Sequence, residues 1–444
     1  AHNVDNNNIL MIISTYKWRE TIMKTASNEQ GIRFIDLFAG LGGFHVGVSQ
    51  LGHQCVFASE LDEGLREIYT KNFSLTPEGD IRRVNEKQIP DHELICAGFP
   101  CQPFSRAGKK KGAKCPSSGK LVDEIFRIAE AKKPKYIMLE NVPDVISIEG
   151  GKFWEYLVSG LVRMGYEVDH KVYTPREFGI PQKRKRVFIV ASRTGLQHFK
   201  WPDPNQKEIT LRSVSLKSND KRNPISKDKE FALDCWQDFI STTSEFTSLP
   251  ILASEFGATY PYEKNITTVK EMSRYKGAFG ASLEGCKTWA SIKEKLPKYS
   301  QNQNGKASPR VAEAIRYSRE IYSRHKVFLD SWKKVVETFP TSWTKFEWQG
   351  NREQPNIWKH IIQFRASGIR IIKPDCAPSL IAMSTTQTPI LGQERRYMSI
   401  KEAAALQSLD GLSFFPTNNG RAFKALGNAV NALIVKEIAK ELIH

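Results

Sequence analysis

Short apolar runs alternate with helical stretches between residues 31 and 192, and this alternation limits the possible folds of the 444-residue chain more than any other feature. Amphipathic periodicity predicts helices at 43–51, 64–72, 121–132 and 153–164. The apolar runs predict strands at 31–38, 55–59, 93–97, 136–139 and 186–191. Strands that alternate with helices form a doubly wound, mostly parallel sheet, so we expect an α/β domain over residues 31–200.

The pattern changes after residue 201. Seven of the nine tryptophans fall in 201–370. The same segment has 28 basic and 19 acidic residues, and this excess of positive charge is about half of the net charge of +17. We expect a second, smaller and irregular domain over 201–395, with most of its tryptophans in the core. Its basic and aromatic side chains also suit contact with nucleic acid. Helices are predicted again at 399–407 and 421–442, in a segment 396–444 that returns to the first domain.

Composition argues against several classes of protein. The longest early apolar run, at 9–13, is shorter than a signal-peptide core or a membrane span, so we expect no membrane association and a cytoplasmic location. The seven cysteines are odd in number and have no Cys-x-x-Cys spacing, which indicates reduced thiols and no metal site. The positive net charge favours a polyanionic partner. The Asn-rich residues 1–30 are left out of the fold prediction as an extension.

A glycine-rich turn, residues 38–43, joins the first predicted strand to the first helix. Doubly wound sheets bind nucleotide-like ligands at such turns, although a tight strand-to-helix connection has the same composition. His45 stands where a dinucleotide fingerprint requires glycine, which argues against a nicotinamide oxidoreductase. Glu60 follows the next strand and is placed to accept hydrogen bonds from ribose hydroxyls. Asp80 could accept one from an adenine amino group, and on its own it also fits a turn.

Cys101 follows the strand at 93–97 and lies between Pro100 and Pro103, which stiffen the turn. Such a turn can hold a thiol at the mouth of a cleft, whereas an isolated cysteine is usually an inert small apolar residue. Residues 106–120 are rich in Gly, Ser and Lys and resemble either a basic lid over this site or a solvated loop.

Glu140 follows the strand at 136–139 and is expected in the same crevice as Cys101. A buried carboxyl group there could hold a proton for a heterocyclic nitrogen, and the alternative is a helix-capping carboxylate. Arg184 and Arg186 precede the last strand and alternate onto one face. Two guanidinium groups on one face fit a phosphate or a base carbonyl oxygen, and they also fit a solvated basic edge.

Taken in order, these motifs resemble the DNA cytosine-5 methyltransferase family. The resemblance covers about 31–200 and 396–430, and the family places a variable target-recognition domain where this chain has 201–395. It implies a Rossmann-like S-adenosylmethionine methyltransferase fold. It rests on DLFAGLGGF at 36–44, Glu60, GDI at 79–81, GFPCQPFS at 98–105, ENV at 140–142, QKRKR at 182–186, RYMSIKEAAALQ at 396–407 and GNAV at 427–430.

The resemblance implies a reaction on a cytosine that is flipped out of double-stranded DNA. The Cys101 thiolate would add to C6, so that C5 attacks the methyl group of S-adenosylmethionine and S-adenosylhomocysteine is released. Glu140 would protonate or hydrogen-bond N3, Arg186 would hold O2, and Arg184 would support the adduct or a neighbouring phosphate. We assign DNA contacts to Gln102, Ser105, Lys109, Lys110, Lys111 and Gln182.

By the same resemblance, Phe38 would stack on the cofactor adenine, Glu60 would bind its ribose and Asp80 its amino group, and Asn428 with Val430 would line the methionine end. The full set of expected cofactor contacts is Phe38, Ala39, Gly40, Leu41, Gly42, Gly43, Glu60, Leu61, Asp80, Ile81, Pro100, Asn428 and Val430. Two residues depart from the family pattern. Leu61 replaces an aromatic residue that some members have, and Ala405 replaces an arginine that many relatives carry.

Three other functions remain open at this point. A tRNA cytosine methyltransferase would use the same scaffold, but the long interval 201–395 favours duplex DNA. A base-flipping DNA reader without turnover would have no need of the intact catalytic residues. An amino-methylating enzyme would need a D/N-P-P-Y/F motif, which the sequence lacks. We expect a monomeric enzyme of bacterial or phage origin, with a restriction endonuclease of the same target as a possible partner.

Overall fold

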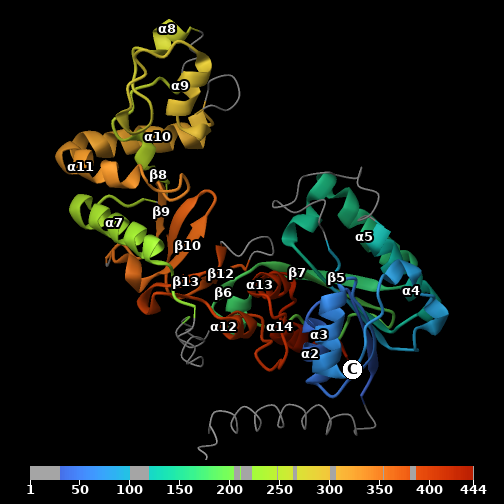
Figure 1. Cartoon of the computed structure of the whole chain (residues 1–444). Coiled ribbons are helices and arrows are strands. Elements are labelled where there is room, and N and C mark those ends of the chain that lie inside the picture. Colours follow the sequence, from blue (N-terminus) through green and yellow to red (C-terminus); the bar gives the residue numbers. More distant parts are fainter. Residues whose placement is uncertain are drawn as a thin grey trace, which may run out of the picture. The chain divides into compact units, whose positions relative to one another are not determined.

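A computed structural model describes residues 31–100, 120–204, 211, 223–247, 249–263, 268–300, 307–353, 355–380 and 387–443. The described residues form two compact units (Figure 1). Unit 1 takes those of 1–219, 375–385 and 399–444, and unit 2 takes those of 220–374 and 386–398. The segment at 375–385 falls within the predicted second domain, but its strand β12 (Ala377–Pro378) pairs with β6 (Gln182–Lys183) of unit 1.

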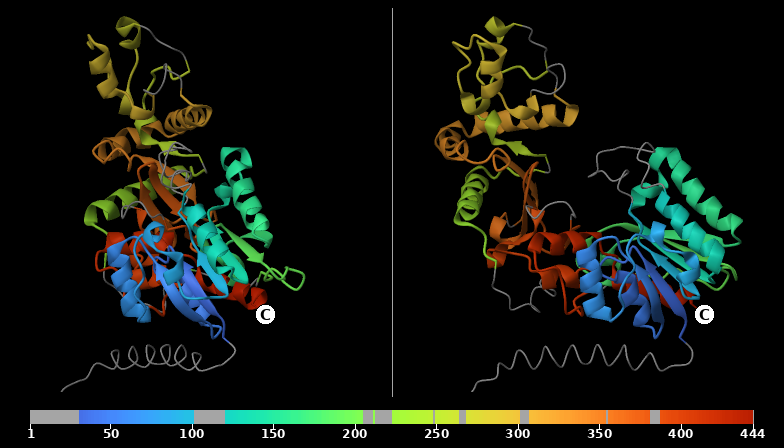
Figure 2. Two further views of the ribbon diagram at one scale, coloured as in Figure 1. Left: turned by 90° about the vertical axis from the view of Figure 1, so that its right-hand side faces the viewer. Right: turned by 45° about the vertical axis from the view of Figure 1, so that its right-hand side comes forward.

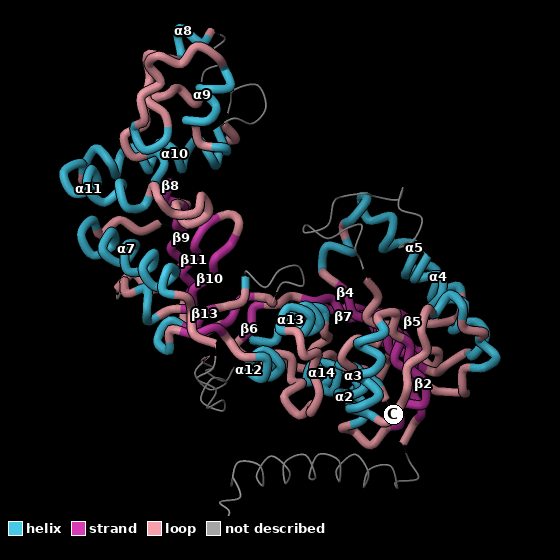
Figure 3. The backbone as a smooth tube through the Cα atoms, viewed as in Figure 1, coloured by secondary structure: helices cyan, strands magenta, loops and turns pink. Residues whose placement is uncertain are grey.

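Unit 1 contains a six-stranded sheet in the order β2-β1-β3-β4-β7-β5. Figure 3 shows strands of this sheet, among them β4, β7 and β5, in magenta. Neighbouring strands from β2 to β4 are parallel, whereas β7 runs antiparallel to both β4 and β5. The sheet is therefore mostly parallel, as expected, with one reversed strand. The strands are β1 (Arg33–Leu37), β2 (Gln54–Ser59), β3 (Leu94–Ala97), β4 (Tyr136–Asn141), β5 (Glu167–Tyr173) and β7 (Arg186–Ser192).

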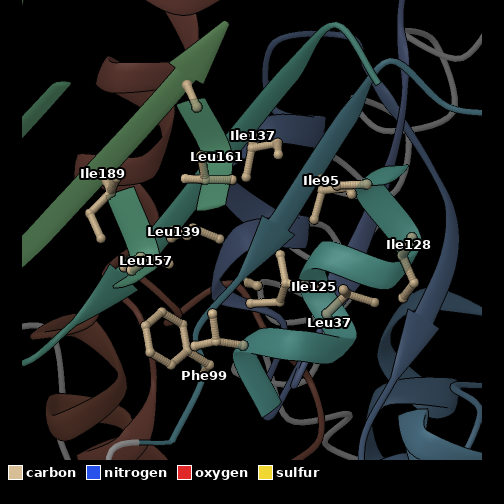
Figure 4. Packing of buried hydrophobic residues seen from close by; sticks show 14 of the residues in the cluster. Leu37, Ile95, Phe99, Ile125, Ile128, Ile137, Leu139, Leu157, Leu161 and Ile189 are labelled. Atoms are coloured by element: carbon tan, nitrogen blue, oxygen red, sulfur yellow. The ribbon is translucent and has the colours of Figure 1, made fainter. Parts of the chain in front are cut away.

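Helices of unit 1 cover both faces of this sheet because its central strands are apolar on both sides. One face packs through Leu37, Ile95 and Leu139 against α4 and α5 (Figure 4). The opposite face packs through Phe34 and Met138 against α2 and α14. The helices of unit 1 are α2 (Gly43–Ser49), α3 (Glu63–Phe73), α4 (Lys120–Lys132), α5 (Lys152–Arg163), α12 (Ile400–Ala405), α13 (Asn419–Asn428) and α14 (Ala432–Leu442).

The single helix predicted at 421–442 is wrong, because the structure has two helices there. Helix α13 ends at Asn428, and Ala429 adopts an extended conformation with φ −60° and ψ 144°. Asn431 then caps α14 by accepting a hydrogen bond from the Ile434 N–H. An Asn side chain that caps a helix is a start signal inside an otherwise helical pattern, and this signal divides the segment.

Unit 2 is more regular than the sequence predicts. Its six-stranded sheet has the order β14-β13-β10-β11-β9-β8. One face of the sheet packs against α7, α10 and α11 around Trp236, Trp332, Phe346 and Trp348 (Figure 2). The elements are α7 (Lys227–Thr243), β8 (Ile251–Leu252), α8 (Val269–Met272), α9 (Trp289–Lys295), α10 (Pro309–Arg324), α11 (Lys326–Val336), β9 (Lys345–Gln349), β10 (Ile361–Arg365), β11 (Gly368–Ile372), β13 (Ile390–Leu391) and β14 (Arg396–Tyr397).

Within the described part of the chain, no helix is both long and apolar enough to cross a membrane. The cysteines at 55, 96, 235, 286 and 376 are free thiols.

Candidate active site

The turn after β1 requires glycine for two physical reasons. Gly40 and Gly42 have φ values of 55° and 80°, which side chains rarely adopt. A Cβ at Gly43 would lie 2.3 Å from the Val430 carbonyl oxygen, so only glycine allows the two backbones to approach this closely. Phe38 also has a positive φ, of 58°, and its ring is half-buried. This strained backbone is the predicted cofactor turn, and it lies at the carboxyl end of β1.

Glu60 is held against this turn by hydrogen bonds to both of its carboxylate oxygens. The Gly40 N–H donates to Oε2 at 2.9 Å, and the Asp62 N–H donates to Oε1 at 2.9 Å. Arg66 on α3 donates from Nη1 to the carbonyl oxygens of Glu60 and Leu61 at 3.0 and 2.9 Å. The carboxylate is thus preorganised, and each oxygen retains capacity to accept from a ligand hydroxyl. Arg66 is a site residue that the sequence analysis missed.

A pocket of about 1010 Å³ opens between the end of β2, Leu61 and residues 75–90. Leu61, whose side chain is largely exposed, lines the pocket together with Asp80. Asp80 caps the short 3-10 helix Ile81–Arg83, and its carboxylate accepts hydrogen bonds from Arg82 Nε and Nη2 at 2.8 and 2.6 Å. These hydrogen bonds lower the pKa of Asp80. The Ile81 side chain, a predicted cofactor contact, is buried in the hydrophobic core and does not line the pocket.

Glu140 lies at the end of β4 and is 6% exposed. Arg186 Nε forms an ion pair with Glu140 Oε1 at 3.0 Å, but Oε1 has no aligned hydrogen bond within the described residues. Burial raises the pKa of Glu140, and the charges of Arg186 and Arg184 oppose this rise. A buried carboxyl group with a raised pKa can hold or donate a proton near neutral pH.

Strand pairing places the turn that leads to Cys101 beside Glu140. Ala97 on β3 pairs with Leu139 on β4, and Asn141 Nδ2 donates to the Phe99 carbonyl oxygen at 3.1 Å. Pro100, which is exposed, ends this described stretch. Cys101 itself lies outside the described residues, as do Gln102, Ser105, Lys109, Lys110, Lys111 and all but the last residue of the lid predicted at 106–120.

Arg184 and Gln182 are both buried, whereas a DNA contact requires a side chain at the surface. Arg184 is 3% exposed and donates to the carbonyl oxygens of Gly427 and Ala429 at 2.7 and 3.0 Å. Burial lowers the pKa of Arg184 to about 9, and Arg186 adds to this effect while Glu140 opposes it. Gln182 is fully buried, and its Oε1 accepts a hydrogen bond from Gln407 Nε2 at 3.0 Å. The prediction that Gln182 contacts DNA is therefore not supported by its position.

The turn between α13 and α14 carries the two remaining predicted cofactor residues. Asn428 is exposed, and Val430 is 8% exposed. A Cβ at Gly98 would lie 3.1 Å from Val430 Cγ2 and 3.9 Å from Glu140 Oε2. Val430 and Glu140 thus both approach the side of Gly98 where a side chain would stand, so the C-terminal turn lies near the end of β3.

A buried polar cluster behind the glycine turn was also missed by the sequence analysis. Asp36 is fully buried and accepts a hydrogen bond from the His45 N–H at 3.3 Å. The His45 ring is hydrogen-bonded to the Tyr69 hydroxyl at 2.7 Å and stacks on Phe73 with 4.0 Å between ring centroids. In the sequence, the only sign of this cluster was that Asp36, an acidic residue, lies near the end of an apolar strand. The described residues contain no group of three or more His, Cys, Asp or Glu side chains that could hold a metal ion.

Known proteins are similar to this chain over most of its length. The profile of the family described as C-5 cytosine-specific DNA methylase matches residues 32–444. The Type II methyltransferase M.HhaI of Haemophilus parahaemolyticus is 39% identical over 224 residues, which are 50% of this chain and 68% of that protein. M.AluI of Cellulosimicrobium cellulans, also a Type II methyltransferase, is 27% identical over 502 residues, covering 93% and 92% of the two chains.

A solved structure has the same fold. The Entamoeba histolytica methyltransferase EhMeth aligns with a TM-score of 0.50 at 14% identity, over 93% of this chain and 98% of its own.

Proposed function

The chain belongs to the C-5 cytosine-specific DNA methylase family, and on this premise we propose that it transfers a methyl group from S-adenosylmethionine to C5 of a flipped-out cytosine in double-stranded DNA. The observation that carries the proposal is the buried Glu140–Arg186 pair beside the turn that leads to Cys101. A proton-holding carboxyl group next to a nucleophile suits addition to an aromatic ring whose nitrogen must gain a proton.

The residues around the glycine turn fit the proposed cofactor. Glu60 presents both carboxylate oxygens where a ribose diol would bind, and the pocket lined by Leu61 and Asp80 has room for an adenine ring. The close approach of Gly43 and Val430 leaves the α13–α14 turn beside the expected methionine end. When bound, the cofactor supplies an electrophilic methyl group. Phe38 would stack on adenine, and Asn428 would contact the amino-acid portion.

Each catalytic side chain has a separate proposed task. Cys101 attacks cytosine C6 as the thiolate, which makes C5 nucleophilic. Glu140 donates a proton or a hydrogen bond to N3, so that negative charge does not accumulate on the ring. Arg186 holds Glu140 in place and donates to the cytosine O2. Once C5 carries the methyl group, N3 returns its proton to Glu140 and a solvent water takes the C5 proton, so that the C5–C6 double bond re-forms and the Cys101 thiolate leaves. The base must leave the stack, since C6 is not accessible to a thiol inside a duplex.

We further propose that unit 2 selects the target sequence and that the enzyme is the modification partner of a restriction endonuclease with the same target. Type II methyltransferases are the relatives that support this context. Bisulfite sequencing of a plasmid from a host that expresses the chain tests both activity and target. The expected result is protection of one cytosine within a single short sequence, and random or absent protection would contradict it.

A covalent trap tests the chemistry directly. DNA that contains 5-fluorocytosine at the target cannot lose fluorine, so the adduct should accumulate and survive denaturing electrophoresis in the presence of S-adenosylmethionine. The variant Cys101→Ser should give no adduct while it still binds the same duplex. Labelled methyl transfer to tRNA instead of DNA would overturn the proposed substrate.

A further inference from the structure

Arg184 connects two parts of the proposed active site that are far apart in the sequence. Its Nη1 and Nη2 donate to the carbonyl oxygens of Gly427 and Ala429 at 2.7 and 3.0 Å. Both acceptors lie at the C-terminal end of α13, where the last carbonyl groups have no partner inside the helix and carry partial negative charge. A buried guanidinium therefore caps α13 through two charge-assisted hydrogen bonds.

The capped turn is in contact with the cofactor side of the site. The Val430 carbonyl oxygen approaches Gly43 so closely that a Cβ there would lie 2.3 Å away. On its far side, Asn431 Nδ2 donates to the Leu406 carbonyl oxygen at 3.2 Å. Arg184 and Asn431 thus hold the two ends of one short turn, and Val430 between them has little room to move.

Arg184 also acts on the proposed proton donor. Its positive charge lowers the pKa of Glu140, as does that of Arg186, whereas burial raises it. Among the described residues, Arg186 alone makes a direct ion pair with Glu140, at 3.0 Å. The two arginines are two residues apart in the chain, yet Arg186 contacts the carboxylate and Arg184 contacts a helix end.

We propose that Arg184 is a positioning residue, which holds the turn 427–431 against the glycine turn and supplies part of the positive charge around Glu140. This inference rests on the proposed function. Each terminal nitrogen of Arg184 donates one N–H to a backbone carbonyl and the residue is 3% exposed, so the side chain is engaged within unit 1 and is not presented to a DNA phosphate. The role differs from the one that the family resemblance implies.

Separate binding measurements distinguish positioning from substrate contact. Arg184→Lys keeps the charge, but one ammonium group cannot reach both carbonyl oxygens with the same fork geometry. We expect the Kd for S-adenosylmethionine to rise about tenfold, which corresponds to the loss of one charge-assisted hydrogen bond. The Kd for target duplex should remain within about twofold of wild type, as expected when no phosphate contact is lost. Lys185→Met, at an exposed neighbouring position, is the control and should alter neither cofactor affinity nor folding.

A pH profile tests the charge that Arg184 contributes. The protonated form of Glu140 is the active one in this proposal, so kcat/KM should fall as pH rises through the pKa of Glu140. Arg184→Met removes a positive charge that favours the carboxylate, and the alkaline limb should therefore move to higher pH. Arg184→Lys should leave the limb near its wild-type position. If Arg184→Met does not fold, the cofactor affinity of Arg184→Lys still decides the question.

Two results would overturn the inference. In the first, Arg184→Lys weakens DNA binding, or lowers kcat, while cofactor affinity is unchanged, as expected for a substrate contact. In the second, Arg184→Lys has no effect on cofactor affinity. A wild-type protein that neither binds S-adenosylmethionine nor methylates DNA would instead overturn the proposed function itself.

Discussion

At the scale of single residues, Asp36 is a carboxyl group whose burial behind the glycine turn is electrostatically unfavourable. Its carboxyl group is fully buried, and Oδ1 has no hydrogen-bond partner among the described residues. Burial raises the pKa of Asp36 well above its usual value, and the hydrogen bond from the His45 N–H only partly offsets this. The group is therefore most easily accommodated in its neutral form.

We predict that Asp36→Asn becomes increasingly stable relative to wild type as pH rises above about 4, the usual pKa of an aspartate. Below this pH the group is protonated in both folded and unfolded chains. Above it, the unfolded chain loses the proton first, so the free energy of unfolding of wild type falls by up to about 1.4 kcal/mol per pH unit until the folded-state pKa is reached. Urea unfolding of both proteins between pH 4 and pH 7 measures the difference. A difference that does not change with pH would refute the prediction.

Arg82 competes for the carboxylate that is proposed to bind adenine. It donates to both oxygens of Asp80 from a largely exposed side chain. We predict that Arg82→Ala lowers the Kd for S-adenosylmethionine by about threefold, because the weak, exposed ion pair with Asp80 no longer has to be broken. Calorimetric titration measures the change. Arg83→Ala, at the same pocket, controls for the lost positive charge and should have a smaller effect. Weaker binding by Arg82→Ala would contradict the prediction.

The sequence located most candidate residues but not their partners. Glu60 and Glu140 could be chosen because each follows an apolar strand, and strand ends meet at one edge of a sheet. Asp80 was chosen from the motif at 79–81. The bonds of Arg184 to Gly427 and Ala429 could not be predicted, since they join residues more than 240 positions apart in the chain. The prediction for Gln182 failed for a similar reason, because its buried side chain accepts a hydrogen bond from Gln407, which is distant in the sequence.

At the scale of elements, hydrophobic periodicity predicted the central strands of the unit 1 sheet but not its edge strand β5. Strand β5 alternates between exposed and half-buried residues over most of its length, so it lacks the continuous apolar run of β3 and β4. Strand β7 has that apolar run, but the run does not show that β7 is antiparallel to β4. Direction is set by how the connecting segment returns to the sheet, and a hydrophobic pattern carries no information about it.

The break between α13 and α14 leads to a prediction about Asn431. This residue accepts from the Ile434 N–H as the cap of α14 and also donates to the Leu406 carbonyl oxygen, in a buried position. We predict that Asn431→Ala lowers the free energy of unfolding by about 2–3 kcal/mol, from the lost cap and the unpaired buried carbonyl.

A matched variant isolates the second contribution. Asn418 caps α13 by accepting from the Arg421 N–H, but it is exposed. Asn418→Ala should therefore lose only about 1 kcal/mol, the usual value of a cap. Denaturant unfolding of the two variants gives the comparison. Equal losses would show that the bond to Leu406 contributes nothing.

At the scale of the whole molecule, the net charge of +17 distinguishes two kinds of DNA contact. About half of the positive excess lies in 201–370, most of which belongs to unit 2. Charges spread over a surface bind phosphates without regard to sequence, whereas base edges are distinguished by a few directed hydrogen bonds. Affinity and specificity should therefore respond differently to salt.

We predict a steep salt dependence of DNA affinity that is shared by target and non-target duplexes. If about six phosphates are neutralised, the Kd should rise by about a thousandfold between roughly 50 and 200 mM salt, because bound counterions are released. Fluorescence anisotropy with a target duplex and a scrambled duplex of the same length gives both slopes. The slopes should be similar, so that the ratio of the two Kd values changes little. A Kd that hardly depends on salt would show that the basic residues of unit 2 do not contact the DNA backbone, even if methyl transfer takes place as proposed.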